Sequence, residues 1–245
     1  MCIIDKLECA FIPLCKVASS SLLTHFAEEV YDDEYLNNLK QKTTASTYRG
    51  ILRKKMHNDF DVNYRTPDNK PRLEKYFSFA FVRNPWHRIV SAYLQFLRWK
   101  ETQLKTQSER KDFAGLSVLK MMELMDNNFS FESFVNFVKN IERNHSEEVN
   151  HHWRSQVGRL YIEGLHPIDY NFIGRLESID KDFFYVADKL NLKHKTLSNF
   201  NHFEEYNYKE FYTNKKLIDD VAEYYTRDID VFKYEFDNPS YIVHP

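Results

Sequence analysis

The chain has 245 residues, which suits one α/β domain with insertions, and we expect a single domain over residues 1–245. Hydrophobic residues make up 42% of the sequence, enough for a sizeable core. The formal net charge is −2, which provides no global basic field to attract nucleic acid or an anionic membrane. Any anionic ligand must therefore be held by a local site.

The cysteine pattern and the start of the chain bear on location. Cys2, Cys9 and Cys15 form no CxxC pair and no zinc pattern, which favours a reducing compartment. The beginning of the chain is mildly apolar, but charged residues interrupt it far short of the roughly 20 apolar residues that a membrane span needs. For a full-length chain we therefore expect a cytoplasmic protein with no membrane span, and the sequence does not indicate its oligomeric state.

Strands and helices are expected to alternate along the chain. Short apolar runs predict strands at 8–13, 76–82 and 170–174. Amphipathic or charged stretches predict helices at 20–30, 31–60, 86–99, part of 100–128, 129–143, 178–192 and 214–236. The stretch 61–72 contains two prolines and is predicted to be a loop. This alternation predicts an α/β fold with a central parallel sheet, flanking helices and helix-rich insertions.

The first candidate site is the loop between the strand at 8–13 and the helix that follows it. A helix N-terminus binds phosphate through its unpaired N–H groups and its positive dipole end, and Lys16 adds a mobile positive charge. The residues after the lysine complete the loop with small side chains and hydroxyl donors: Val17, Ala18, Ser19, Ser20 and Ser21. The pattern GxxxxGK[ST] is absent, and an ordinary turn with a capping serine explains the same residues.

The second candidate site is the segment FVRNPWHRIVSAY, residues 81–93. Arg83 leaves the end of a predicted strand, and Ser91 lies about two turns into the next helix, so both can reach an anion at the strand's carboxyl end. Arginine suits this role because its planar fork binds two phosphate oxygens at once. Arg88 is either a second phosphate ligand or a surface salt-bridge residue. Pro85 fits the first turn of the helix.

Together these segments resemble the 5′-phosphosulfate loop and the 3′-phosphate motif of sulfotransferases that use 3′-phosphoadenosine 5′-phosphosulfate (PAPS). KVASSS matches the family's K-[VT]-A-[SC]-[TS]-[SN] loop, and FVRNPWHRIVSAY is close to FVRNP-x-x-R-x-x-S-x-Y. Downstream, HHWRSQ and DYNFIGRLESIDKDF resemble segments of the carbohydrate branch, which is the Golgi-type and bacterial, family 2-like group. The resemblance runs from about residue 8 to residue 236 and implies a P-loop-like fold.

The resemblance also implies a reaction. A sulfuryl group would pass from PAPS to a hydroxyl of a carbohydrate or similar polar acceptor, either a glycan or a small molecule, and leave PAP without a metal. It assigns Lys16 to the bridging oxygen and the 5′-phosphate, and Ser19, Ser20 and Ser21 to that same phosphate. Arg83 and Ser91 would bind the 3′-phosphate. Such transfers depend on positioning and charge stabilisation more than on covalent work by the protein.

The acceptor hydroxyl needs a general base, and histidine suits this role. His57 lies 26 residues before Arg83, in an interval where related glycan sulfotransferases place a catalytic histidine. His152 lies in the HW segment and matches a family histidine. A carboxylate such as Glu177 is the third option. The histidines fit no strong zinc spacing, so no metal is expected.

Three further features stay open at the sequence level. The family usually has proline where this chain has Cys15, whose thiol is either redox-sensitive or a small buried residue. Arg175 and Glu177 either shape a pocket or are charges at a helix start. The segment 194–199 lies where the family often has a loop over the nucleotide.

Competing functions remain. The chain could be an O-sulfotransferase for a small hydroxylated secondary metabolite, or a non-catalytic PAP-binding module. A P-loop kinase would need a glycine-rich loop and an aspartate for magnesium at a strand end, and neither is evident in a chain with 5 glycines.

Overall fold

We analysed a computed structural model of the chain. It describes residues 1–60, 75–106, 118–125, 127–144, 151–161, 170–197 and 206–237, so the predicted loop at 61–72 lies outside the described residues. The chain forms two compact units, each made from two stretches. Unit 1 comprises Met1–Val82 and Leu160–Glu205, and unit 2 comprises Arg83–Arg159 and Tyr206–Pro245. The single domain over 1–245 stays a prediction.

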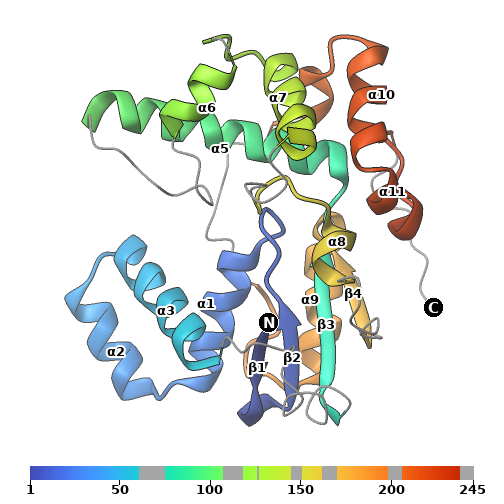
Figure 1. Cartoon of the computed structure of the whole chain (residues 1–245). Helices are drawn as coiled ribbons and strands as arrows, with labels where there is room; N and C mark the ends of the chain where they lie inside the picture. Colours follow the sequence, from blue (N-terminus) through green and yellow to red (C-terminus); the bar gives the residue numbers. More distant parts are fainter. Residues whose placement is uncertain are drawn as a thin grey trace. The chain divides into compact units, whose positions relative to one another are not determined.

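Unit 1 contains a four-stranded sheet in the order β1-β2-β3-β4. Its strands are β1 (Cys2–Ile4), β2 (Cys9–Ile12), β3 (Phe77–Val82) and β4 (Phe172–Arg175). Strands β2, β3 and β4 run parallel, whereas β1 is antiparallel to β2 (Figure 1). The predicted α/β fold with a mostly parallel central sheet and flanking helices is therefore confirmed. All three predicted strands are present, each within a few residues of its expected bounds.

Strand β1 was not predicted. Its three residues, Cys2–Ile4, are buried, and they pair with β2 after a single 3-10 turn, η1 (Asp5–Leu7). Glu8 ends this turn in the left-handed region at φ 48°. A three-residue apolar run is too short to show a period, so only the pairing with β2 defines it as a strand.

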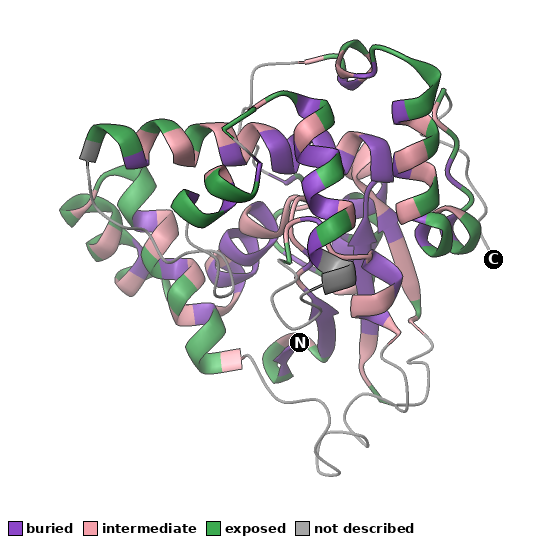
Figure 2. Ribbon diagram, turned by 45° about the horizontal axis from the view of Figure 1, so that its top comes forward, coloured by how far each residue is buried: buried purple, intermediate pink, exposed green. Residues whose placement is uncertain are grey.

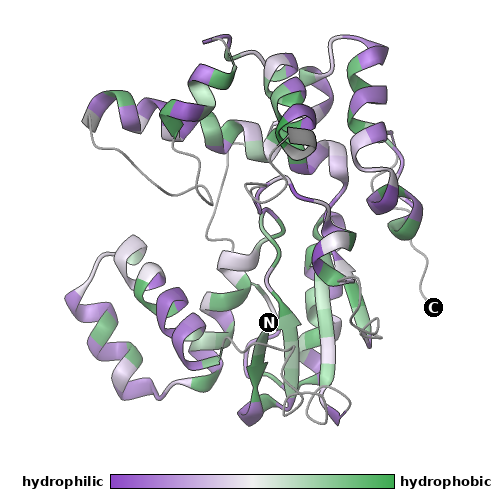
Figure 3. Cartoon of the chain, viewed as in Figure 1, coloured by the Kyte–Doolittle hydropathy of each residue, from purple (hydrophilic) through white to green (hydrophobic). Residues whose placement is uncertain are grey.

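The helices of unit 1 are α1 (Ser19–Val30), α2 (Asp33–Lys42), α3 (Ala45–Phe60), the 3-10 helix η4 (Leu176–Ser178) and α9 (Ile179–Lys189). At the starts of α2 and α3, polar side chains satisfy free main-chain N–H groups. The run predicted as helical at 31–60 is two helices. Asp32 accepts from the Tyr35 N–H at 2.7 Å to begin α2, and Thr44 accepts from the Thr47 N–H at 3.3 Å to begin α3. Figure 3 contrasts the hydrophobic strands β1 and β2 with the mostly hydrophilic α2.

An aromatic stripe on one face of β3 forms the core of unit 1. Side chains alternate along a strand, so Phe77, Phe79 and Phe81 share this face. Phe79 stacks on Phe11 of β2 with ring centroids 5.4 Å apart, and Phe26 of α1 lies 5.8 Å from the same ring. Strands β1, β2 and β3 are almost wholly buried, whereas β4 is mostly half-buried (Figure 2). The stripe fixes α1 against the sheet, and α1 begins directly after the first candidate loop.

Unit 2 is helical in the residues that the structure describes. Its elements are α5 (Pro85–Thr106), α6 (Val118–Leu124), α7 (Phe131–Asn144), α8 (Gln156–Leu160), η5 (Tyr208–Phe211), α10 (Lys215–Tyr224) and α11 (Thr226–Phe232). Helix α5 begins at Pro85, as predicted, and continues beyond the expected end to Thr106. None of the described helices combines the length and the hydrophobicity that a membrane crossing requires.

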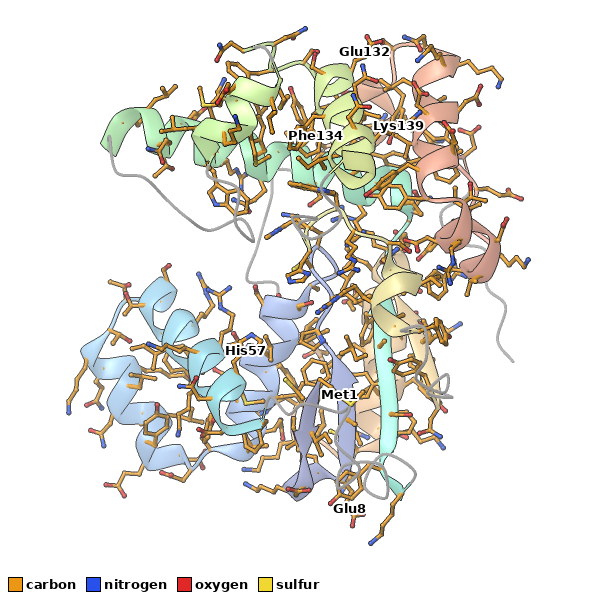
Figure 4. The ribbon with its side chains drawn as sticks, in the orientation of Figure 1. Met1, Glu8, His57, Glu132, Phe134 and Lys139 are labelled. Carbon is orange, nitrogen blue, oxygen red and sulfur yellow. The ribbon has the colours of Figure 1, made fainter. Side chains whose placement is uncertain are left out.

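Helix α7 organises the core of unit 2 (Figure 4). Phe134 stacks on Phe96 at 5.8 Å and meets Trp153 edge-on at 5.7 Å. On the polar side of the same helix, Lys139 pairs with Asp220 at 2.7 Å and Glu223 at 2.8 Å of α10. One amphipathic helix thus contributes both an aromatic core face and a charged contact.

Gly174 allows β4 to pack against the aromatic stripe. A Cβ atom at this position would lie 2.5 Å from a ring carbon of buried Phe81. We therefore expect Gly174→Ala to lower the free energy of unfolding by about 1–3 kcal/mol, the usual cost of overpacking a core. Urea denaturation followed by far-UV circular dichroism measures this.

Gly50→Ala is the matched control. Gly50 lies in α3 with nothing within 4 Å of an added Cβ. The same substitution there should raise the free energy of unfolding by roughly 0.5–1 kcal/mol, because alanine is the better helix former. Equal stability of Gly174→Ala and the wild type would contradict the packing argument.

Candidate functional site

The loop between β2 and α1 has an unusual main chain. Lys16 and Ala18 both lie in the left-handed region, with φ 70° and φ 61°. This region is sparsely populated by residues that have a Cβ atom, and such residues gather at functional loops. Left-handed residues in a loop also let successive N–H groups converge, as they do in many anion-binding loops. The carbonyl of Ala18 accepts from the N–H groups of Ser21 at 2.9 Å and Leu22 at 3.0 Å, which starts α1.

The three serines of this loop are not equivalent. The Ser19 hydroxyl donates to the Leu14 carbonyl and closes the loop on itself. Ser21 is buried, with 4% of its surface exposed. The Ser20 oxygen accepts from Arg53 Nη1 at 2.7 Å, so its own proton points elsewhere. Ser20 is therefore the serine whose hydroxyl is best placed to donate to an anion.

Lys16 and Cys15 lie at the tip of this turn and are both half-buried. Cys15 is thus neither a fully buried small residue nor a fully exposed thiol, and its redox role stays a prediction. Val17, by contrast, is buried and fixes the middle of the loop to the core of unit 1.

The end of β4 belongs to the same edge of the sheet. The register pairs Arg175 with Val82, and the carboxyl ends of parallel strands share one edge, where ligands bind in open α/β sheets. Asp182 of α9 accepts from the Arg175 N–H at 2.7 Å and from the Ser178 hydroxyl at 2.8 Å. The sequence drew attention to Glu177, but Asp182 is the carboxylate that organises this turn.

In unit 2, a glutamine clamps the main chain of Arg83. Gln156 Oε1 accepts from the Arg83 N–H at 2.9 Å, and its Nε2 donates to the Arg83 carbonyl at 2.8 Å. Gln156 is held in turn by Asp228, which is fully buried and accepts from the N–H groups of Gln156 at 2.8 Å and Val157 at 2.9 Å. A buried carboxylate needs such donors. The HHWRSQ segment therefore fixes the residue that the sequence assigns to the 3′-phosphate.

A tyrosine and a histidine lie near the Arg83 guanidinium. Its Nη2 donates to the Tyr206 hydroxyl at 3.1 Å. His87 stacks on Tyr208 with ring centroids 5.0 Å apart and an interplanar angle of 21°. Burial, and then the charge of Arg83, lower the pKa of His87 to about 3. Sequence reasoning missed His87, Tyr206 and Tyr208, although His87 lies one helical turn after Arg83.

Two other polar residues of the second motif, Asn84 and Arg88, hold main-chain groups in place. Buried Asn84 accepts from the Trp86 N–H at 3.0 Å and caps α5. Arg88 is 1% exposed and donates to the carbonyls of Arg154 at 2.8 Å and His151 at 3.2 Å. Arg88 is therefore no surface salt-bridge residue, because its guanidinium supports the HHWRSQ segment from inside the unit. Ser91 is buried in the next turns of α5.

The two candidate bases lie in different units. His57 is an exposed residue of α3 in unit 1 (Figure 4). His152 belongs to unit 2, is half-buried, and meets Trp99 edge-on at 5.1 Å. In the ranges that the structure describes, no group of three His, Cys, Asp or Glu residues could hold a metal ion.

Helix α1 also anchors the start of the segment at 194–199, of which residues 198 and 199 lie outside the described residues. Buried Glu29 accepts from the N–H groups of Lys193 and His194, both at 3.0 Å, and lies 2.8 Å from His194 Nδ1. Burial acts to raise the pKa of Glu29, but these hydrogen bonds outweigh it and the pKa is lowered. The nearby His25 Nε2 lies 3.9 Å from the same carboxylate.

The chain belongs to the sulfotransferase family, whose family model matches residues 3–235. Over 131 residues it is 34% identical to carbohydrate sulfotransferase 12 of Mus musculus, covering 46% of this chain and 28% of that protein. It is 25% identical to carbohydrate sulfotransferase 11 of Mus musculus over 191 residues, covering 73% of this chain and 52% of that protein.

The matched segments thus span about half or less of the length of these relatives. No solved structure gives a significant match to the chain.

The low pKa of His87 predicts a pH dependence of stability. The unfolded imidazole takes up a proton below its ordinary pKa of about 6.5, whereas the folded one stays neutral until about pH 3. Stability should therefore fall as the pH drops from 6.5 towards 3. As the pH falls from about 7.5 to 5.5, the His87 imidazole alone lowers the free energy of unfolding by about 1.4 kcal/mol.

Urea denaturation at these two pH values, on the wild type and His87→Gln, measures the effect. From pH 7.5 to pH 5.5, the free energy of unfolding should fall by about 1.4 kcal/mol less in His87→Gln than in the wild type. The same pH slope in both proteins would show that His87 titrates normally in the fold.

Proposed function

We propose that the chain transfers a sulfuryl group from PAPS to a hydroxyl of a carbohydrate or similar polar acceptor, giving a sulfate ester and PAP. One observation carries the proposal. A chain of the sulfotransferase family presents Lys16, in a loop with two left-handed residues, at the N-terminus of α1 and at the carboxyl end of a parallel strand. The names of the relatives, carbohydrate sulfotransferases, support the acceptor class.

Unit 1 would hold the 5′ end of the donor. The N–H groups of the loop residues Val17–Ser20 and the dipole of α1 favour a phosphate there. Lys16 would contact the bridging oxygen and offset the charge that develops on the departing phosphate. Ser20 would donate its hydroxyl proton to the 5′-phosphate, whereas Ser19 closes the loop through Leu14.

Arg83 and Ser91 would bind the 3′-phosphate. The Gln156 clamp supports this role, because an arginine whose main chain is held at both its N–H and its carbonyl presents its guanidinium from a fixed point. A 3′-phosphate site separates PAPS from nucleotides that lack this group. The stack of His87 and Tyr208 beside Arg83 offers aromatic surface for the same ligand.

The reaction balances without a further reactant. The acceptor oxygen attacks sulfur in line as the bond from sulfur to the 5′-phosphate oxygen breaks, and PAP leaves with that electron pair. The acceptor proton passes to a general base, for which His57 and His152 are the candidates and Glu177 the third. In this scheme Lys16 and Arg83 supply the positive charge, and no step requires a metal ion.

Binding of PAP tests the donor site. We expect calorimetry to detect binding by the wild type, and Lys16→Ala and Arg83→Gln to weaken it about tenfold to a hundredfold, since hydrogen bonds to charged groups contribute about 1.5–3 kcal/mol. With adenosine 5′-phosphate, which lacks the 3′-phosphate, the effect of Arg83→Gln should disappear while that of Lys16→Ala remains. A wild type that binds no PAP would overturn the proposed function.

Transfer of radiolabelled sulfate from PAPS tests the base. We expect either His57→Ala or His152→Ala to lower the transfer rate by about a hundredfold or more with PAP affinity retained, as befits loss of a general base. If neither does, the base is not a histidine of this pair and Glu177→Gln becomes the next variant.

The acceptor panel separates the remaining alternatives. Carbohydrates and small hydroxylated aromatic compounds are compared at equal concentration. Sulfation of the second group alone would favour a metabolite O-sulfotransferase. PAP binding without transfer to any acceptor would indicate a non-catalytic PAP-binding module.

A further inference from the structure

An arginine from another helix reaches the first turn of α1. Arg53 lies in the middle of α3, and its Nη1 is 2.7 Å from the Ser20 oxygen, although 33 residues separate the two in the sequence. Both residues are half-buried and both belong to unit 1. Helix α3 packs along α1, and a second bond, from the Tyr48 hydroxyl to Glu28 at 3.0 Å, fixes the pair of helices. Arg53 is therefore held beside the candidate phosphate loop by the packing of two helices.

Among the described residues, no acidic partner balances the charge of Arg53. In the part of the chain that the structure describes, no carboxylate lies within 4.0 Å of its guanidinium, and its hydrogen bond goes to a neutral hydroxyl. Its neighbour Lys55, by contrast, pairs with Asp59 at 2.8 Å on the same helix. A guanidinium carries five N–H donors, and the bond to Ser20 uses one of them. Its unbalanced positive charge adds to the positive end of the α1 dipole.

The hydrogen bond also orients Ser20. Because the Ser20 oxygen accepts from Arg53, the serine proton must point away from the guanidinium and can be donated to another acceptor. Ser20 is the second residue of α1, where the main-chain N–H groups have no partner within the helix. The serine proton, these N–H groups and the guanidinium charge all favour an anion at this end of α1.

We propose that Arg53 is a positioning residue for the 5′-phosphate end of the sulfuryl donor, acting through the Ser20 hydroxyl and through its own charge. This inference rests on the proposed function and assigns a role within its donor site. The alternative is that the bond between Arg53 and Ser20 only joins α1 to α3. A purely structural bond would affect every ligand of the folded protein alike, whereas a positioning role concerns only ligands that carry a 5′-phosphate.

The experiment compares two nucleotides that differ only in this group. Calorimetry measures the dissociation constants of PAP and of adenosine 3′-phosphate for the wild type, Arg53→Gln and Arg53→Lys. We expect Arg53→Gln to weaken PAP binding about tenfold or more, as for loss of a charged hydrogen bond, and to leave adenosine 3′-phosphate within about twofold. Arg53→Lys should recover part of the PAP affinity, because it keeps the charge but loses the planar fork.

Lys54→Gln is the matched control, since it removes the same charge from the next residue of α3, which is exposed to solvent. It should leave the affinity for PAP within about twofold of the wild type. If Lys54→Gln weakens PAP binding as much as Arg53→Gln does, the effect is a general loss of positive charge and the inference fails.

The outcomes separate the two proposals. Unchanged PAP affinity in Arg53→Gln, or an equal loss for both nucleotides, would overturn the role of Arg53 while binding by the wild type still supports the donor site. A wild type that binds no PAP would instead overturn the proposed function. If Arg53→Gln does not fold, the two nucleotides are compared on Arg53→Lys and Ser20→Ala instead. Both variants should bind PAP more weakly than the wild type and bind adenosine 3′-phosphate as the wild type does.

Discussion

Main-chain groups at the ends of parallel strands need new partners, because the hydrogen-bond ladder of the sheet stops there. This chain meets that need with a side chain after each of its three parallel strands. After β2 a serine hydroxyl donates to the Leu14 carbonyl, and after β3 the Gln156 amide binds both main-chain groups of Arg83. After β4 the Asp182 carboxylate accepts from the Arg175 N–H. Each of these bonds fixes a residue at the edge of the sheet where α/β proteins bind ligands, so the candidate site depends on them.

The sequence alone predicted the features that depend on local patterns of residues. The apolar runs gave the three parallel strands, and Pro85 marked the start of α5 because proline suits a first helical turn. The bonds that organise the site could not be found in this way. Asp228 lies 72 residues from Gln156, and Arg53 lies 33 residues from Ser20, so neither pair shares a period or a motif. Such contacts arise from tertiary packing, and local patterns in a single sequence do not reveal them.

Two parts of the motifs have turned out to serve the fold itself. The HHWRSQ segment suggested a base at His152, yet its glutamine clamps Arg83 and its carbonyls accept from the buried Arg88. Asn84 in the second motif caps α5. Each motif therefore contains residues that position others beside residues that are proposed to bind the ligand. Hydrogen-bond partners separate the two kinds where sequence identity alone does not. The predicted cytoplasmic location and the roles of the predicted site residues stay predictions.

The left-handed pair in the first loop has a consequence for the entropy of ligand binding. Glycine loops reach such conformations easily but also leave them easily, so they lose freedom when an anion orders them. Lys16 and Ala18 have Cβ atoms, which make the left-handed region costly for them, so the loop keeps this conformation only where the surrounding fold holds it. Buried Val17 between them and the bond from the Ser19 hydroxyl to the Leu14 carbonyl supply this hold, so the fold itself shapes the loop. Preorganisation of this kind leaves more of the contact energy to appear as affinity.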